Sequence, residues 1–255
     1  MMKKLAAVLS GVVLLAAVLL VLKWGAVKGF FSRENRSKMN VQIALHNLSK
    51  GEAAEAVRDL EGAVTLDPKN AEAFYYLGKA YQRRGDAPEK QILAYRKALE
   101  LQPDSAEARI SLGTAYYGIG KKSEAEQEFQ EVLKADPMNA KANNNLGRML
   151  MEEGRNREAE AYLKKAIEAE PSDEYSLNNL GNLYFIEGKY KESEDAYRKS
   201  LALDAKNPGP RYFLAKLAEK RGDKKAAVEQ WQKAVELGLE GDELKEAQEH
   251  LRRLK

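Results

Sequence analysis

The segment AEARISLGTAYYGIGKKSEAEQEFQEVLKADP, residues Ala106–Pro137, contains two helical patterns in succession. One pattern precedes Gly120, and the second lies between Gly120 and Pro137. Glycine readily takes the left-handed conformation that ends a helix, and proline cannot continue one. The segment therefore predicts two helices that are joined by a glycine turn and followed by a proline turn.

The same two-helix unit recurs along the chain about every 34 residues. Prolines that end the unit are 35, 34 and 34 residues apart, at Pro68, Pro103, Pro137 and Pro171, and Ala205 takes the next place. The turn glycines keep this spacing, at Gly51, Gly85, Gly120, Gly154, Gly188 and Gly222. A fixed period of this length predicts a repeat array, in which neighbouring units supply the core that no unit buries alone.

Residues at fixed positions in the unit resemble the tetratricopeptide repeat. The unit that begins at Ala71 follows the family pattern of a large residue, a Leu-Gly pair, an aromatic residue, a second aromatic residue, an alanine and a proline. These are Phe74, Leu77, Gly78, Tyr81, Tyr95, Ala98 and Pro103. The resemblance implies an all-α tetratricopeptide α-solenoid over residues 37–241. Its six helix-turn-helix units start at Ser37, Ala71, Ala106, Ala140, Glu174 and Pro208.

Three units depart from this pattern. The first unit lacks most of the large residues, as terminal repeats often do. In the second unit Gln91 stands where alanine is usual, which predicts looser packing there. In the sixth unit the small residues Ala215 and Ala218 replace the glycine and an aromatic residue.

A closing helix is predicted for residues 242–255. Asp242 is a suitable N-cap, and apolar side chains form one stripe along the helix, at Leu244, Ala247, Leu251 and Leu254. We expect this stripe to cover the sixth unit.

The N-terminal residues predict a membrane anchor. A basic start at residues 1–4 precedes an uncharged run at residues 5–22, and a basic juxtamembrane linker follows at residues 23–36. The run suits one transmembrane helix. A cleaved secretory signal is the alternative, although the run is longer than usual and no clear cleavage site follows it.

The orientation of this anchor depends on two opposing cues. The Met-Lys-Lys start favours a repeat body outside the cytoplasm, whereas the basic linker favours the cytoplasmic side. We expect a single-pass protein of the bacterial inner membrane with its repeats in the periplasm, and the cytoplasmic face is the alternative.

The composition argues against several classes of function. The chain has no cysteine, and its two histidines, His46 and His250, are far apart in sequence without a ligand motif around them. Its net charge is +3, but residues 1–38 hold 7 of the 42 Lys and Arg and 1 of the 39 Asp and Glu, so residues 39–255 carry about −3. We therefore expect no enzyme, catalytic residue, metal or cofactor, and no nucleic-acid partner.

Asparagines occur at positions that face away from the predicted core. On a helix that turns 100° per residue, positions 2, 6, 9 and 13 of the unit lie opposite the packing stripe. Asn145 and Asn179 both occupy position 6, and the amino-acid sequence around them is similar to repeats of the O-GlcNAc transferase type. That resemblance implies an asparagine ladder that holds an extended peptide by its main chain, since an amide both donates and accepts hydrogen bonds. Solvent exposure without a ligand is the alternative.

The resemblance also implies that this face lines a concave groove. We expect a peptide or partner helix to bind there through aromatic, basic and amide side chains, at Tyr75, Tyr76, Lys79, Tyr117, Lys141, Asn144, Asn145, Arg148, Tyr175, Asn178, Asn179, Asn182, Phe185 and Tyr212. The predicted function is a membrane-anchored scaffold or adaptor for proteins in bacterial cell-envelope assembly. A self-assembling scaffold and a regulatory subunit that recruits a separate enzyme to the membrane are the alternatives.

Overall fold

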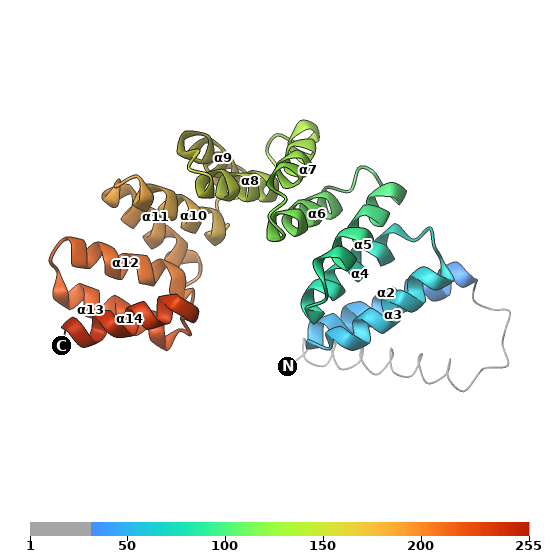
Figure 1. Cartoon of the computed structure of the whole chain (residues 1–255), viewed down its shortest axis with the longest axis horizontal. Helices are drawn as coiled ribbons and strands as arrows, with labels where there is room; N and C mark the ends of the chain where they lie inside the picture. Colours follow the sequence, from blue (N-terminus) through green and yellow to red (C-terminus); the bar gives the residue numbers. More distant parts are fainter. Residues whose placement is uncertain (1–31, 255) are drawn as a thin grey trace, which may run out of the picture. The chain divides into compact units, whose positions relative to one another are not determined.

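Helices form all of the regular secondary structure in the described part of the chain. The computed structural model describes residues 32–254, in which six helix pairs are followed by a single helix (Figure 1). The first helix of each pair, called the A helix below, is α2 (Arg33–Lys50), α4 (Ala71–Arg84), α6 (Ala106–Gly118), α8 (Ala140–Glu152), α10 (Glu174–Ile186) or α12 (Pro208–Lys220). The second, the B helix, is α3 (Ala53–Leu66), α5 (Pro88–Leu101), α7 (Lys122–Ala135), α9 (Asn156–Ala169), α11 (Tyr190–Leu203) or α13 (Lys224–Glu236). The single helix is α14 (Gly241–Leu254), so the predicted six units with a closing helix are confirmed.

Each A helix begins at a polar side chain that caps it. The capping oxygens accept hydrogen bonds from backbone N–H groups of the first turn, and they belong to Ser32, Asn70, Ser105, Asn139, Asp173 and Asn207. These N–H groups have no partner inside the helix, so the caps favour helix initiation at these points.

Glycine turns reverse the chain between the A and B helices. Gly120 has φ +77°, and the next residue, Lys121, donates its backbone N–H to the Tyr116 carbonyl over 3.0 Å. The other five turn glycines have φ between +74° and +83°. The predicted left-handed turn is therefore confirmed in all six units.

The Leu-Gly pair of the repeat allows close contact between the two helices of a unit. A Cβ atom added to the glycine would lie only 2.5 to 2.8 Å from a large side chain of the B helix, in the pairs Gly78–Tyr95, Gly113–Phe129, Gly147–Leu163 and Gly181–Tyr197. All four of these large side chains are buried. The alternation of small and large residues thus explains how these four repeat units pack at high density.

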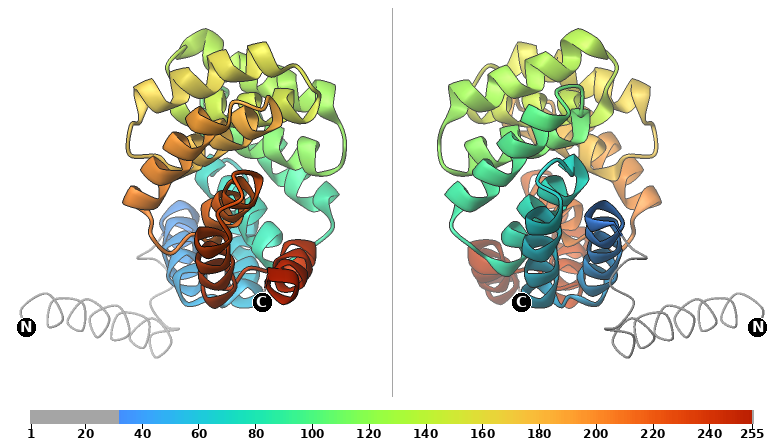
Figure 2. Two further views of the ribbon diagram at one scale, coloured as in Figure 1. Left: turned by 90° about the vertical axis from the view of Figure 1, so that its left-hand side faces the viewer. Right: turned by 90° about the vertical axis from the view of Figure 1, so that its right-hand side faces the viewer.

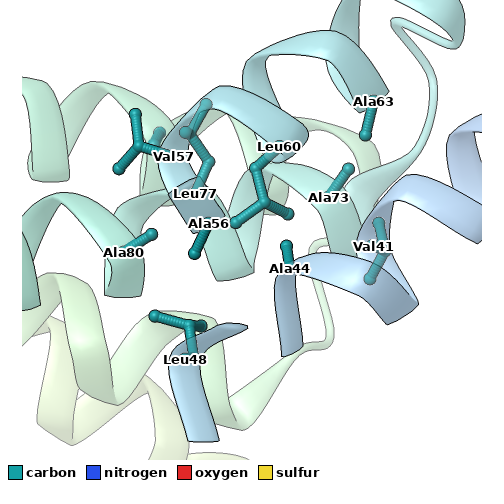
Figure 3. Close-up of a cluster of buried hydrophobic side chains, with 11 residues drawn as sticks. Val41, Ala44, Leu48, Ala56, Val57, Leu60, Ala63, Ala73, Leu77 and Ala80 are labelled. Atoms are coloured by element: carbon teal, nitrogen blue, oxygen red, sulfur yellow. The ribbon is translucent and has the colours of Figure 1, made fainter. Parts of the chain in front are cut away.

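The chain divides into two compact units of structure. The first extends to Pro103 and contains α2 to α5, and the second begins at Asp104 and contains α6 to α14. Within each of them, successive helix pairs pack side by side in chain order (Figure 2). The core of the first compact unit combines side chains from α2, α3, α4 and α5. Figure 3 labels those of the first three helices, which are Val41, Ala44 and Leu48 of α2, Ala56, Val57, Leu60 and Ala63 of α3, and Ala73, Leu77 and Ala80 of α4.

Helix α14 covers the sixth repeat unit. Ala247 is buried, and Leu251 and Leu254 pack against the cluster that contains Tyr212 and Trp231. The helix begins at Gly241, so the predicted N-cap, Asp242, lies in its first turn instead. There the Asp242 carboxylate forms an exposed ion pair with Lys245 at 2.8 Å.

The predicted juxtamembrane linker, residues 23–36, overlaps the first described helix. Ser32 accepts a hydrogen bond from the Asn35 backbone N–H and caps α2, so residues 33–36 are helical. The predicted anchor at residues 5–22 lies outside the described residues, as do residues 1–4. Among the helices of residues 32–254, none has the length and apolar character needed to cross a membrane.

Candidate peptide-binding face

The face predicted to bind a partner lies on the A helices. It consists of positions 2, 6, 9 and 13 of each unit with the adjacent positions 5 and 12, and it is called the A face below. No residue at positions 2, 6, 9 or 13 is buried in any of the six units, whereas Leu77, Leu112, Leu146, Leu180 and Leu214, all at position 7, are buried. The prediction that this side of the helix faces away from the core is therefore confirmed.

The asparagines of α8 and α10 form a bridge between neighbouring units. The Nδ2 atom of Asn179 donates to Oδ1 of Asn144 over 2.8 Å. Asn145 instead donates its amide to the Lys141 carbonyl of its own helix over 2.9 Å. The structure thus links position 5 to position 6, and it does not join the two position-6 asparagines directly. Lys141 itself is exposed, and Asn144, Asn145 and Asn179 are half-buried.

The other two asparagines of α10 contact the protein itself. Oδ1 of Asn182 accepts a hydrogen bond from the Tyr197 hydroxyl over 2.7 Å, which connects α10 to its partner helix α11. Asn178 points toward the next A helix, because its Nδ2 would lie 3.8 Å from a Cβ atom added to Gly209. Its Oδ1 is buried without a hydrogen-bond partner. Asn182 therefore supports the packing of its unit as well as facing the A face.

An ionic cluster joins α6 to α8 on the same face. The Tyr117 hydroxyl donates to the Glu152 carboxylate, which also pairs with Arg148 at 2.9 Å. The Arg148 guanidinium lies 4.7 Å from the centroid of the Tyr117 ring. Burial and the hydrogen bond to Glu152 raise the pKa of Tyr117 to about 12. Two of the predicted binding residues, Tyr117 and Arg148, thus stabilise each other through a carboxylate.

The three predicted residues of α4 form a separate cluster in the first compact unit. The rings of Tyr75 and Tyr76 are 5.0 Å apart, and Nζ of Lys79 lies 5.5 Å above the Tyr75 ring. The Tyr75 ring also contacts the buried Tyr95 ring at 6.1 Å. This cluster is an aromatic and cationic surface on the A face of α4.

Tyr212 and Phe185, which were both predicted to contact a partner, pack against other side chains of the protein. Tyr212 is only 5% exposed, because Trp231 and α14 cover it, and its hydroxyl donates to Glu246 of α14. Phe185 packs its ring against Phe213 at 5.4 Å. Tyr175, by contrast, is 61% exposed. The closing helix therefore removes Tyr212 from the accessible A face, and sequence reasoning did not anticipate this because the contact comes from a helix 34 residues away.

Two cavities lie away from the A face. One of about 400 Å³ is formed by α11, α12 and α13, and one of about 300 Å³ is formed by α9, α10 and α11. Neither cavity includes a predicted binding residue. Residues 32–254 contain no group of three or more histidine or acidic side chains placed to hold a metal ion.

Comparisons with known proteins identify the repeat type. A family model described as the C-terminal domain of cilia and flagella-associated protein 70, a tetratricopeptide domain, matches residues 5–251. Superkiller complex protein 3 of Mus musculus is 34% identical over 86 residues, which are 34% of this chain and 5% of that protein. The chain thus matches only a small part of the length of this curated relative.

Two solved structures are similar to this fold. A structure from a functional characterization of Pseudomonas aeruginosa pilF has a TM-score of 0.72 and 21% identity, and the match covers 86% of this chain and 99% of that one. The structure of PilW, described as a widely conserved type IV pilus biogenesis factor, has a TM-score of 0.72 and 25% identity over 82% of this chain and 96% of that one.

Proposed function

We propose that this chain, which belongs to the tetratricopeptide repeat family represented by the C-terminal domain of cilia and flagella-associated protein 70, is a non-enzymatic adaptor. It binds an extended segment of a partner protein on its A face. Residues 5–22 anchor the adaptor in a bacterial inner membrane, with the repeats in the periplasm. The likeness to PilW supports a role in cell-envelope assembly, since that protein is described as a pilus biogenesis factor.

The observation that carries the proposal is the amide bridge between α8 and α10. The bridge holds Asn144 and Asn179 in fixed positions, and an amide can donate to and accept from the main chain of a bound peptide at once. Lys141 and the 61% exposed Tyr175 flank the bridge in the same two helices. A tyrosine combines apolar area with a polar hydroxyl, which suits it to anchor a partner.

Site-specific cross-linking in the native cell tests this proposal. A photoreactive phenylalanine analogue at Tyr175 is expected to give a discrete adduct with a partner protein. The same analogue at Leu93, which is 69% exposed on the B helix α5, is the matched control and is expected to give none. Equal adducts from both positions would show that the A face is not the binding surface.

A double substitution tests the role of the amides. Asn145→Ala with Asn179→Ala is expected to reduce the Tyr175 adduct while helical circular dichroism stays unchanged, because the first amide bonds within its own helix and the second only bridges two units. An undiminished adduct would mean that the asparagines do not hold the partner.

A reporter that is active only outside the cytoplasm, fused after Lys255, tests the membrane orientation. An active reporter agrees with periplasmic repeats, and a silent one places them at the cytoplasmic face.

A further inference from the structure

The larger cavity is lined by an excess of positive charge. About 400 Å³ of space lies between α11, α12 and α13, and its charged lining consists of Glu194, Arg198, Arg211 and Arg221. Three guanidinium groups thus face one carboxylate. Its apolar lining includes Leu201 and Leu214, so the cavity offers both apolar and cationic side chains.

Two of the arginines already share the single carboxylate. Nη2 of Arg198 lies 2.7 Å from Glu194, and Arg221 pairs with the other oxygen of the same side chain. Burial raises the pKa of Glu194, but the bonds to Arg198 and the charge of Arg221 outweigh that effect and lower the pKa below its usual value. The carboxylate is therefore ionised at neutral pH, and it offsets one of the three positive charges.

Arg211 has no acidic partner in the described part of the chain. Its Nη1 lies 3.2 Å from the side-chain oxygen of Gln230 and its Nη2 lies 3.3 Å from the Ala205 carbonyl, both of which are neutral. Its Nε is buried without an acceptor. A guanidinium in this state is under-satisfied, because it is best stabilised by a carboxylate that accepts two parallel hydrogen bonds.

The third repeat unit contains the acidic partner that Arg211 lacks in the sixth. Arg109 occupies the same repeat position as Arg211, three units earlier, and it pairs with Glu128 at 2.9 Å. Glu128 follows Arg109 by 19 residues, and Gln230 follows Arg211 by the same interval. The sixth unit therefore keeps the arginine and replaces its carboxylate by an amide, which leaves the charge for a ligand.

Comparison with the smaller cavity shows that the larger cavity lacks an aromatic side chain at an equivalent repeat position. The cavity of about 300 Å³ lies between the equivalent helices one unit earlier, and Tyr184 lines it. In the larger cavity Ala218 stands 34 residues after Tyr184, at the same repeat position. The smaller cavity is lined by two lysines and two acidic residues, Lys164, Lys199, Glu192 and Asp195, so its charges balance. Of these two cavities, only the larger combines spare positive charge with the space left by an absent ring.

We propose that the cavity between α11, α12 and α13 binds an acidic segment of a partner protein that carries an aromatic residue. A side-chain carboxylate of the segment pairs with Arg211, and the aromatic ring packs against Ala218 and the apolar lining. This surface is separate from the A face and is a second binding site of the adaptor.

Fluorescence anisotropy with the full-length chain tests the proposal. The probe is a labelled, amidated peptide Glu-Glu-Phe-Glu-Glu. The neutral peptide Gln-Gln-Phe-Gln-Gln amide is expected to bind at least about tenfold more weakly, because it cannot form charge-assisted hydrogen bonds to Arg211. Equal binding of the two peptides would overturn the proposal. Equal binding of the neutral sequence with a free C-terminal carboxylate would overturn the assignment to side-chain carboxylates.

Two substitutions that copy other units locate the site. Gln230→Glu rebuilds the arginine–glutamate pair of the third unit and is expected to weaken binding of the acidic peptide about tenfold while leaving thermal unfolding intact. Gln232→Glu adds the same charge at an exposed position of the same helix and is the matched control. Ala218→Tyr is expected to remove the preference for Phe over Ala in the peptide. Unchanged binding in Gln230→Glu would overturn the proposal.

Discussion

Substitution of Gly113 by alanine tests whether close helix contact is the reason for glycine in the repeat. A Cβ atom at this position would lie 2.8 Å from Cε1 of Phe129 and 3.1 Å from its Cδ1 and Cζ atoms. The Phe129 side chain is 1% exposed and belongs to the core of the second compact unit. The ring or the helices must therefore shift to accommodate one methyl group.

The expected change in stability of Gly113→Ala follows from two opposing effects. Overpacking a well-filled core costs about 1–3 kcal/mol, whereas alanine is favoured over glycine in a helix by about 1 kcal/mol. Gly118→Ala is the matched control, because it lies in the same helix and nothing stands within 4 Å of its added Cβ. The difference between the two variants isolates the contact, and we expect Gly113→Ala to be less stable than Gly118→Ala by about 1–3 kcal/mol.

Native-state hydrogen exchange is the suitable assay for this comparison. A repeat array need not unfold in one step, so a single unfolding midpoint would average over units. We expect Gly113→Ala to lower the protection of amides in α6 and α7, residues 106–135, and Gly118→Ala to leave them unchanged or better protected. Equal protection in the two variants would refute the argument that contact with Phe129 requires glycine.

Three further predictions concern single sites. Trp231→Ala removes a fully buried ring that packs on Tyr212, and we expect a loss of about 3–5 kcal/mol, seen as lower hydrogen-exchange protection in α12 to α14. Because the pKa of Tyr117 is raised in the folded state, this hydroxyl stabilises the fold fully below the pKa of about 10 that it has in the unfolded chain, and the stabilisation is lost as the pH rises through about 12. Glu152→Gln should lower the pKa of Tyr117 in a tyrosinate absorbance titration, with Tyr117→Phe used to identify the signal of this residue. Gly188→Ala forces a non-glycine residue to φ +74° with no contact within 4 Å, so hydrogen exchange in α10 and α11 should show only a backbone cost of about 1–2 kcal/mol.

Local patterns were sufficient to predict the helices and their order. Gly120 ends one helix and Pro137 follows the next, and both effects act within a few residues of the chain. The outward direction of Asn145 and Asn179 was predictable for the same reason, because it depends only on the angular spacing along one helix. The position of Asp242 in the first turn of α14 was not predicted, since helix ends vary by one or two residues.

The sequence by itself determined the period, the turns and the buried stripe of each unit, because these follow from backbone conformation and helical spacing. Only the tertiary structure decided that Asn179 bonds to Asn144, that α14 covers Tyr212 and that Arg211 lacks a carboxylate. Each of these contacts joins different helices and depends on how they pack and on the side-chain rotamers. A repeat pattern therefore predicts which residues face outward, and the packing of neighbouring units decides which of them are left to bind a partner.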